Sequence, residues 1–124
     1  MTTAIIRTDG ASKGNPGHAS TGYHIDLEEV SILEKGEYIG IATNNEAEYQ
    51  AVVQALEAAL ALNLKDVCLL SDSQLLIQQL IGQWKIKNER LMPLFRQARL
   101  LIQQFESMGF IPVLPHLERN YRIQ

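Results

Sequence analysis

The sequence is short of cysteine and has no long apolar run, and both shortages narrow the class of protein. Its one cysteine, Cys68, has no partner for an internal disulfide and lies in an apolar stretch typical of a buried strand. Polar residues interrupt every apolar stretch well before the roughly 20 residues that a membrane-spanning helix needs. The opening segment, which reaches Asp9 and Lys13 early, does not have the pattern of a secretory signal. We therefore expect a cytoplasmic protein.

Positive charge is not in excess either. Lys and Arg total 11 against 14 Asp and Glu, a net charge of −3, which argues against a general nucleic-acid binder. The basic residues are nevertheless clustered in the range 85–99, where Glu89 is the one acid, while acids gather in the range 26–37. The chain can therefore present a local basic face, formed by Lys85, Lys87, Arg90, Arg96 and Arg99.

The length of 124 residues fits one domain, 1–124, with enough chain for a real core. Period-two alternation and apolar runs predict strands at 4–8, 19–27, 31–39, 67–70 and 110–114, with a tight turn at Glu28-Glu29 and a loop at 10–17. Apolar steps of three and four predict helices after 43–45, from Asp72 to about Ile81, and over 94–105, the last ended by Gly109. This order predicts an α/β fold, a mixed sheet with helices on its faces.

Three acids occupy comparable positions in these predicted elements. Asp9 and Asp72 each follow a strand, and Glu48 lies near the start of the long helix. If the two strands are parallel neighbours, all three carboxylates meet at one end of the sheet. Such a cluster repels itself unless cations neutralise it, and carboxylate oxygens suit Mg²⁺ or Mn²⁺. Two ions held about 4 Å apart by such clusters hydrolyse phosphodiesters.

Each acid also has a purely structural explanation. Asp9 precedes a glycine, as turn residues commonly do. Glu48 follows Asn45 at the spacing of a capping box, and Asp72 stands where a simple N-cap belongs. Capping does not explain, however, why three acids should gather at one end of one sheet.

Three segments resemble the signature motifs of the type 1 ribonuclease H family. They are TDGASKGNPG at 8–17, TNNEAEY at 43–49 and SDSQL at 71–75, in the family's order and spacing. The resemblance covers essentially the whole chain. It implies a ribonuclease H-like fold, a five-stranded mixed sheet flanked by helices on both faces. It also implies endonucleolytic cleavage of the RNA strand in RNA–DNA hybrids with two Mg²⁺ ions, for which Mn²⁺ can substitute.

The resemblance also implies roles for individual residues. Asp9, Glu48 and Asp72 would be the metal ligands, with Asp9 shared between both ions. Short amides and hydroxyls suit contacts with 2′-hydroxyls and phosphates, although Thr43 and Asn44 can equally be ordinary helix caps. Trp84 and Lys85 match aromatic and basic positions that face the DNA strand, with a partly buried Trp beside a solvated lysine as the alternative. The residues expected to bind substrate are Ser12, Gly14, Asn15, Thr43, Asn44, Gln74, Trp84 and Lys85.

The final residues depart from the family pattern. The family has a fourth acid ten residues after a histidine, and His116 matches that histidine, which predicts a proton-transfer or product-release role. The matching acid would fall at position 126, beyond the printed sequence. On this basis we expect a weakened enzyme, most simply a monomer.

Two other functions remain open at this point. One is a module of the same fold that grips hybrids or double-stranded RNA without cutting them, which an intact carboxylate set disfavours. The other is an integrase-like or exonuclease domain, which the segments GNPG and TNNEAEY disfavour. Fold analogy alone does not choose among them.

Overall fold

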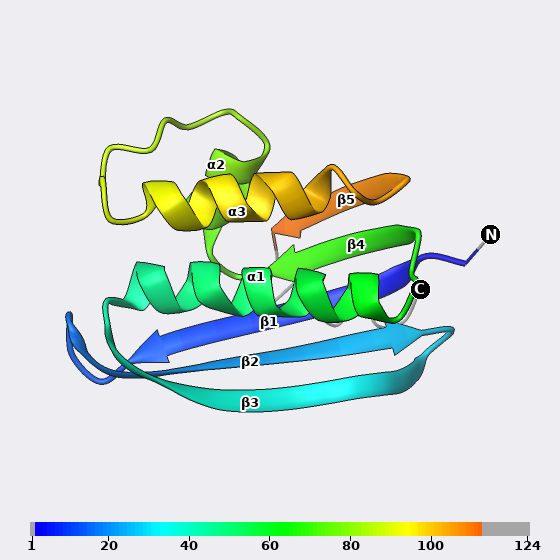
Figure 1. The fold of residues 1–124 in the computed structure, drawn as a ribbon, viewed down its shortest axis with the longest axis horizontal. Helices are drawn as coiled ribbons and strands as arrows, with labels where there is room; N and C mark the ends of the chain where they lie inside the picture. Colours follow the sequence, from blue (N-terminus) through cyan, green and yellow to red (C-terminus); the bar gives the residue numbers. More distant parts are fainter. Residues whose placement is uncertain (1, 113–124) are drawn as a thin grey trace.

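The computed structural model describes residues 2–112 and shows one mixed sheet with three helices (Figure 1). The elements in chain order are the strands β1 (Ala4–Ser12), β2 (Gly17–Leu27) and β3 (Val30–Ala42), the helix α1 (Asn44–Ala61), the strand β4 (Asp66–Ser71), the helices α2 (Gln74–Leu80) and α3 (Met92–Ile102), and the strand β5 (Ser107–Pro112). This is the order of strands and helices that the sequence predicted. Among the described residues, no helix is both long and apolar enough to cross a membrane.

The five strands lie in the order β3-β2-β1-β4-β5. The first three strands pair antiparallel, and β4 pairs parallel with both β1 and β5. The hairpin between β2 and β3 turns at Glu28 and Glu29, whose φ angles of 52° and 66° are left-handed, as two-residue hairpin loops require. The predicted mixed sheet is confirmed, and β5 lies at one of its edges.

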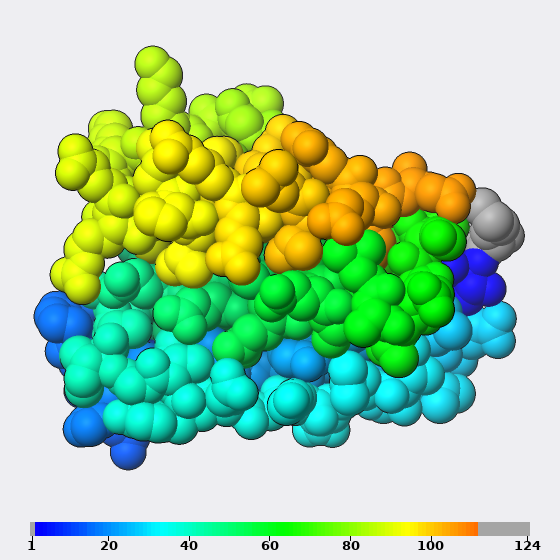
Figure 2. All heavy atoms as spheres, viewed as in Figure 1, coloured from blue at the N-terminus to red at the C-terminus, as the bar shows by residue number. Residues whose placement is uncertain are grey.

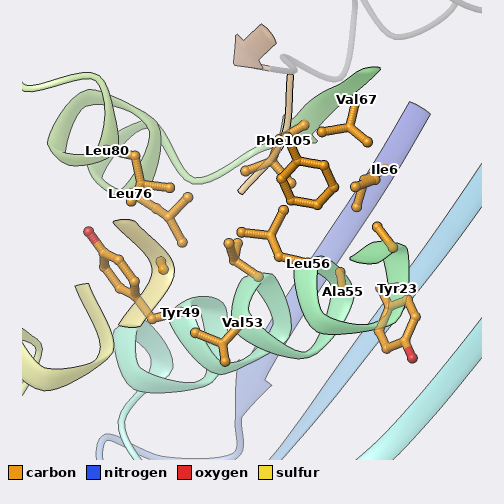
Figure 3. Packing of buried hydrophobic residues seen from close by; sticks show 14 of the residues in the cluster. Ile6, Tyr23, Tyr49, Val53, Ala55, Leu56, Val67, Leu76, Leu80 and Phe105 are labelled. Atoms are coloured by element: carbon orange, nitrogen blue, oxygen red, sulfur yellow. The ribbon is translucent and has the colours of Figure 1, made fainter. Parts of the chain in front are cut away.

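The core lies between the helices and one face of the sheet (Figure 3). Ile6, Val67 and Leu69 point from the strands toward α1, whose Leu56 is fully buried among them. Residues of α2 and α3 join the same cluster. Within residues 2–112, all three helices therefore share one core against one sheet face, whereas the resemblance implied helices on both faces. Helix α1 crosses the sheet above β1 (Figure 1).

Some predicted boundaries were wrong. The predicted loop at 10–17 begins too early, because Gly10 and Ser12 still pair with Thr21 and Ala19 in the β1–β2 ladder. Gly109 does not end a helix. It lies within β5, beside Cys68. Helix α3 ends at Ile102, and after a turn over residues 103–105 the Glu106 and Ser107 N–H groups donate to the Lys65 carbonyl.

Cys68 lies in β4 as predicted, but it is half-buried rather than fully buried. Burial still raises the pKa of its thiol. It packs against the backbone of β5, where a Cβ added to Gly109 would lie 3.3 Å from the Cys68 Sγ. A structural role is therefore sufficient for this residue.

Candidate active site

Asp9 and Asp72 lie just beyond the point where the parallel pairing of β1 and β4 ends. The last parallel pair between β1 and β4 joins Arg7 to Leu70, so each aspartate comes two residues after that pair, Asp9 within β1 and Asp72 directly after the end of β4. Both aspartates are exposed. The topology thus brings together two acids that are far apart in sequence, as the parallel arrangement predicted.

Glu48 reaches the same place from α1, one turn into the helix. The helix approaches β1 very closely at Gly10, where an added Cβ would lie 2.3 Å from the backbone C and O atoms of Ala47. The Gly10 N–H donates a 2.6 Å hydrogen bond to the Glu48 Oε1. Glu48 is only 7% exposed. Gly10, in the segment 8–17, therefore positions the carboxylate of Glu48, in the segment 43–49.

The three carboxylates converge. One oxygen from each of Asp9, Glu48 and Asp72 can be chosen so that all three lie within 4.8 Å of one another. The convergence expected from the sequence is thus present, while the role of these residues as metal ligands remains a prediction.

The surroundings of the cluster disfavour the charged form of Glu48. Burial, together with the smaller effect of the Asp72 and Asp9 charges, raises the pKa of Glu48 to about 7, against the opposing effect of the Gly10 hydrogen bond. A buried carboxylate facing two other acids is costly to ionise, and a cation would relieve that cost.

The structural explanations of the three acids are each wrong. Asp9 is not a turn residue, since it lies inside β1 opposite Gly22. Asp72 does not cap α2, because Ser73 is the N-cap and its Oγ accepts from the Leu76 N–H at 3.2 Å.

The capping box of α1 is formed by other residues than expected. The Thr43 Oγ1 accepts from the Glu46 N–H at 3.1 Å, and the Glu46 Oε1 accepts from the Thr43 N–H at 2.8 Å. The pair Asn45 and Glu48 therefore plays no such part, and the Glu48 carboxylate is directed to the acid cluster instead. The spacing of Thr43 and Glu46 in the sequence could have identified this box.

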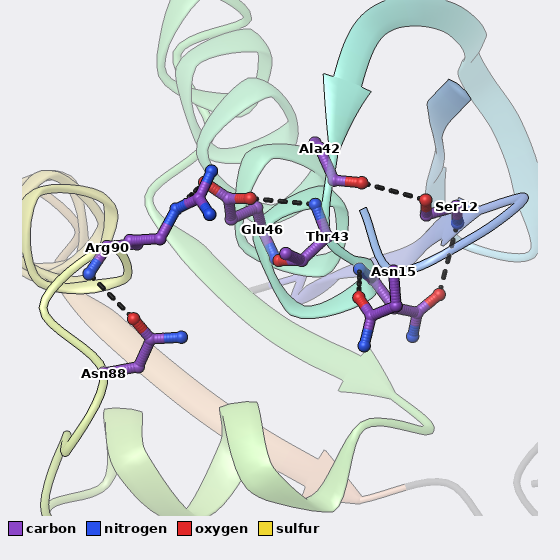
Figure 4. A network of polar contacts seen from close by, with 8 residues as sticks. Ser12, Asn15, Ala42, Thr43, Glu46, Asn88 and Arg90 are labelled. Carbon is purple, nitrogen blue, oxygen red and sulfur yellow. Dashed lines mark hydrogen bonds and ion pairs between the residues drawn. The ribbon is translucent and has the colours of Figure 1, made fainter. Parts of the chain in front are cut away.

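The loop between β1 and β2 is tied to the start of α1 (Figure 4). The Asn44 N–H donates to the Asn15 Oδ1 at 3.0 Å, and the Ser12 N–H donates to the Asn44 Oδ1 at 3.2 Å. The Ser12 hydroxyl also donates to the Ala42 carbonyl at 2.8 Å and contacts the Gly14 carbonyl. Five of the predicted substrate-binding residues thus form one assembly: Ser12, Gly14, Asn15, Thr43 and Asn44.

The other predicted substrate-binding residues lie on α2 and after it. Gln74 is the exposed first residue of α2. Trp84 and Lys85 are both exposed, in the segment 81–91 that joins α2 to α3. Figure 2 shows this yellow-green segment projecting from the body of the molecule. His116 lies outside the described residues.

A broad hollow of about 770 Å³ adjoins the acid cluster. It is open to solvent and lies along β1, β2 and β3 beside the end of β4. Its lining includes Asp9, Asp72, His24 and Lys35. Two of the three carboxylates, those of Asp9 and Asp72, therefore border an open hollow.

Sequence reasoning missed two buried polar residues near the site. The Tyr49 hydroxyl, one residue after Glu48, donates to the Gln79 Oε1 at 2.7 Å. A Tyr at a buried helix position and a Gln within an apolar helix face gave no signal by themselves, because only the packing of α1 against α2 brings them together.

Comparisons with known proteins agree with this geometry. The family model described as "Reverse transcriptase-like" matches residues 7–119. The bifunctional protein Rv2228c of Mycobacterium tuberculosis is 37% identical over 108 residues, covering 86% of this chain and 30% of that protein. The structure of its N-terminal RNase H domain superposes with a TM-score of 0.88 at 34% identity, covering 97% of this chain and 92% of that one.

Two further proteins are similar. Ribonuclease HI of Halobacterium salinarum is 43% identical over 106 residues, covering 85% of this chain and 53% of that protein. LC11-RNase H1 in complex with an RNA/DNA hybrid has a TM-score of 0.86 at 31% identity, covering 95% of this chain and 90% of that one. The chain spans between about a third and half of the length of the curated relatives named here.

Proposed function

This chain belongs to the type 1 ribonuclease H family, and from that premise we propose that it hydrolyses the RNA strand of RNA–DNA hybrids. The observation that carries the proposal is the convergence of Asp9, Glu48 and Asp72, with ligand oxygens within 4.8 Å, beside an open hollow. A module that only binds nucleic acid has no need of a buried carboxylate facing two others, because such a cluster repels phosphates.

The donor set fits a hard divalent cation. Three carboxylate groups are the oxygen ligands that such ions prefer. The pKa of Glu48 is raised by burial and, to a smaller extent, by the Asp72 and Asp9 charges, and a bound cation offsets both costs. Asp9, Glu48 and Asp72 would hold the metal, and we propose two Mg²⁺ ions, with Mn²⁺ able to replace them. When bound, the ions supply charge neutralisation at the reacting phosphodiester.

The protein's own groups then orient the substrate. The amide oxygens of Asn15 and Asn44 accept from the protein backbone, which leaves their NH₂ groups as donors for 2′-hydroxyl and phosphate oxygens. Gln74 supplies a further exposed amide beside Asp72. Gly10 holds Glu48 through its N–H, so the buried carboxylate keeps one orientation.

The direct test is incubation with an RNA–DNA hybrid labelled on either strand, with Mg²⁺, with Mn²⁺ and with a chelator. The RNA strand is expected to be cut only when a divalent ion is present, while a DNA duplex stays intact. Binding without cutting under every condition would favour the non-cutting module. Equal cutting of DNA duplexes would favour the integrase-like or exonuclease class.

A further inference from the structure

Tyr49 and Gln79 form a polar pair within the apolar contact between α1 and α2. Their exposed fractions are 1% and 3%. The Tyr49 hydroxyl donates to the Gln79 Oε1 at 2.7 Å, and the Gln79 Nε2 donates to the Lys85 carbonyl at 3.5 Å. Two successive hydrogen bonds, the first buried and the second partly buried, therefore join the helix that carries Glu48 to the backbone of the exposed segment.

The surroundings of this pair are apolar. Leu76 and Leu80 of α2 are fully buried nearby, and the Tyr49 ring points toward α2 (Figure 3). Burying an amide and a hydroxyl there costs free energy unless both are hydrogen-bonded. No buried side-chain polar atom within residues 2–112 lacks a partner. Since two apolar side chains would pack as well, the polar pair's distinctive contribution is direction: it fixes where the Lys85 backbone lies.

The segment 81–91 is held near Trp84 by backbone hydrogen bonds from the Gln83 and Trp84 N–H groups to the Gln78 carbonyl, at 2.9 and 3.1 Å. Ile86 packs half-buried against the core. Between these two points, the Gln79 amide adds its contact to the Lys85 carbonyl.

The segment 81–91 leaves α2 through Gly82, whose φ of 86° is left-handed, and residues 85–88 belong to no helix or strand. Its first end is fixed by Arg99, whose Nη1 donates to the Leu80 carbonyl at 2.6 Å. Its last end is fixed by Leu91, which is 2% exposed, and by the Arg90–Glu46 ion pair (Figure 4).

The centre of the segment presents the groups suited to a nucleic-acid strand. Trp84 is 47% exposed, and Lys85 and Lys87 are exposed beside it. An aromatic ring stacks on a base or sugar, and ammonium groups contact phosphates. For such contacts to add to those at the carboxylates, their distance from the carboxylates must be fixed.

We infer that Gln79, braced by Tyr49, is a positioning residue that holds Trp84 and Lys85 at a fixed reach from the carboxylate cluster and so sets the affinity for the nucleic-acid strand. The inference rests on the proposed function for its substrate. Its mechanical part, the fixing of the segment, does not depend on any substrate.

The mechanical part can be measured on the free protein, because Trp84 is the one tryptophan of the chain. Acrylamide quenching of its fluorescence is expected to increase in Gln79→Met, which keeps the side-chain volume and removes both hydrogen bonds. The matched control is Gln78→Met, a neighbouring amide on the same helix that leaves the link from Tyr49 to Lys85 in place. Equal quenching in wild type and Gln79→Met would overturn the inference.

The functional part is tested by a double-mutant cycle in an Asp9→Asn background, where the substrate is not consumed. Gln79→Met is expected to weaken binding of a short RNA–DNA hybrid roughly fivefold, the equivalent of one hydrogen bond. In a chain that already carries Trp84→Ala and Lys85→Ala, the same change should weaken binding no further. In the otherwise wild-type enzyme, KM should rise while kcat at saturating hybrid is retained. Additive losses in the cycle would mean a merely structural role and would overturn the inference.

Gln79→Met alone could unfold the protein by leaving the Tyr49 hydroxyl buried without a partner. The double variant Tyr49→Phe with Gln79→Met controls for this effect. Replacing both polar partners by apolar groups of similar shape avoids an orphaned buried group, so this protein is expected to unfold near the wild-type denaturant concentration. It should still show the increased Trp84 quenching and the raised KM. If it behaves as wild type in both, the inference fails. If wild type neither binds nor cuts hybrids, the proposed function fails, and the quenching comparison still decides the mechanical part.

Discussion

At the residue scale, the three acids of the cluster occupy unequal environments. Asp9 and Asp72 are exposed, whereas Glu48 is buried and holds a backbone N–H of β1. Desolvation therefore acts chiefly on Glu48, while mutual repulsion acts on all three. The two kinds of acid are expected to respond differently to substitution.

Asp9→Asn is expected to abolish hybrid cleavage, with a loss of roughly 100-fold or more, because it removes a charged ligand from a metal-dependent site. The fold should be unharmed, since the change also relieves carboxylate repulsion. Urea unfolding in chelator should show unchanged or slightly higher stability. A clear loss of stability would indicate that Asp9 serves the fold instead.

Glu48→Gln tests the raised pKa through the pH dependence of stability. The Glu48 pKa is about 7 in the folded protein against 4.5 for an ordinary glutamate. Between these values the unfolded chain loses its proton while the folded protein keeps it, so rising pH destabilises the wild type. The Gln variant lacks this loss, and its carbonyl can still accept from Gly10.

In metal-free buffer, the variant should therefore gain about 1–3 kcal/mol of unfolding free energy relative to wild type between pH 5 and pH 8. Denaturant titrations at each pH measure the difference. Parallel pH profiles for the two proteins would show that the Glu48 pKa is near its ordinary value.

At the scale of elements, α1 connects every part of the candidate site. Its first residue, Asn44, ties the loop after β1, and its capping box also holds Arg90. Glu48 and Tyr49 follow within the next turn and face the acid cluster and α2 respectively. The position of α1 against β1 therefore sets the whole arrangement.

Gly10→Ala should displace α1 from β1. The added Cβ would meet the Ala47 backbone at 2.3 Å, and backbone cannot move aside as a side-chain end can. We expect a loss of roughly 1–3 kcal/mol of stability together with a large fall in activity. Gly36→Ala is the matched control, since its Cβ would lie 3.7 Å from the Thr21 carbonyl. Equal unfolding midpoints for the two variants would show that this close approach does not constrain the fold.

At the scale of the whole molecule, the protein's net charge of −3 has the same sign as the charge of the proposed nucleic-acid substrate, so the two repel each other. Binding then depends on local basic groups and on the metal rather than on a general positive field. The segment 81–91 supplies such groups where it projects from the body (Figure 2).

Hybrid affinity should accordingly fall steeply with salt. Replacing Lys85 or Lys87 by Ala should each reduce the slope of log affinity against log salt by about one. Lys65→Ala, at an exposed position before β4, serves as the control with an unchanged slope. Fluorescence anisotropy of a labelled hybrid at several salt concentrations measures this. Identical slopes for all variants would remove the segment from the binding surface.

The sequence by itself determined the kinds of element, their order and the three acids. Those features follow from local periodicity and from motifs, which neighbouring residues specify. The sequence pattern predicted the ends of the strands and helices less well. For example, β1 runs through Gly10 to Ser12 because β2 continues to pair with it there.

Only the tertiary structure decided which of these residues cap helices, which are buried and which touch. Glu48 and its hydrogen-bond partner Gly10 are 38 residues apart, and Tyr49 and Gln79 are 30 apart. Burial, pKa and hydrogen bonding at such pairs depend on how β1, α1 and α2 pack. A helix start offers several possible caps, and packing selects Thr43 with Glu46 while leaving Glu48 to face Asp9 and Asp72. The physical reason is that desolvation and charge repulsion arise from neighbours in space, which a one-dimensional pattern does not contain.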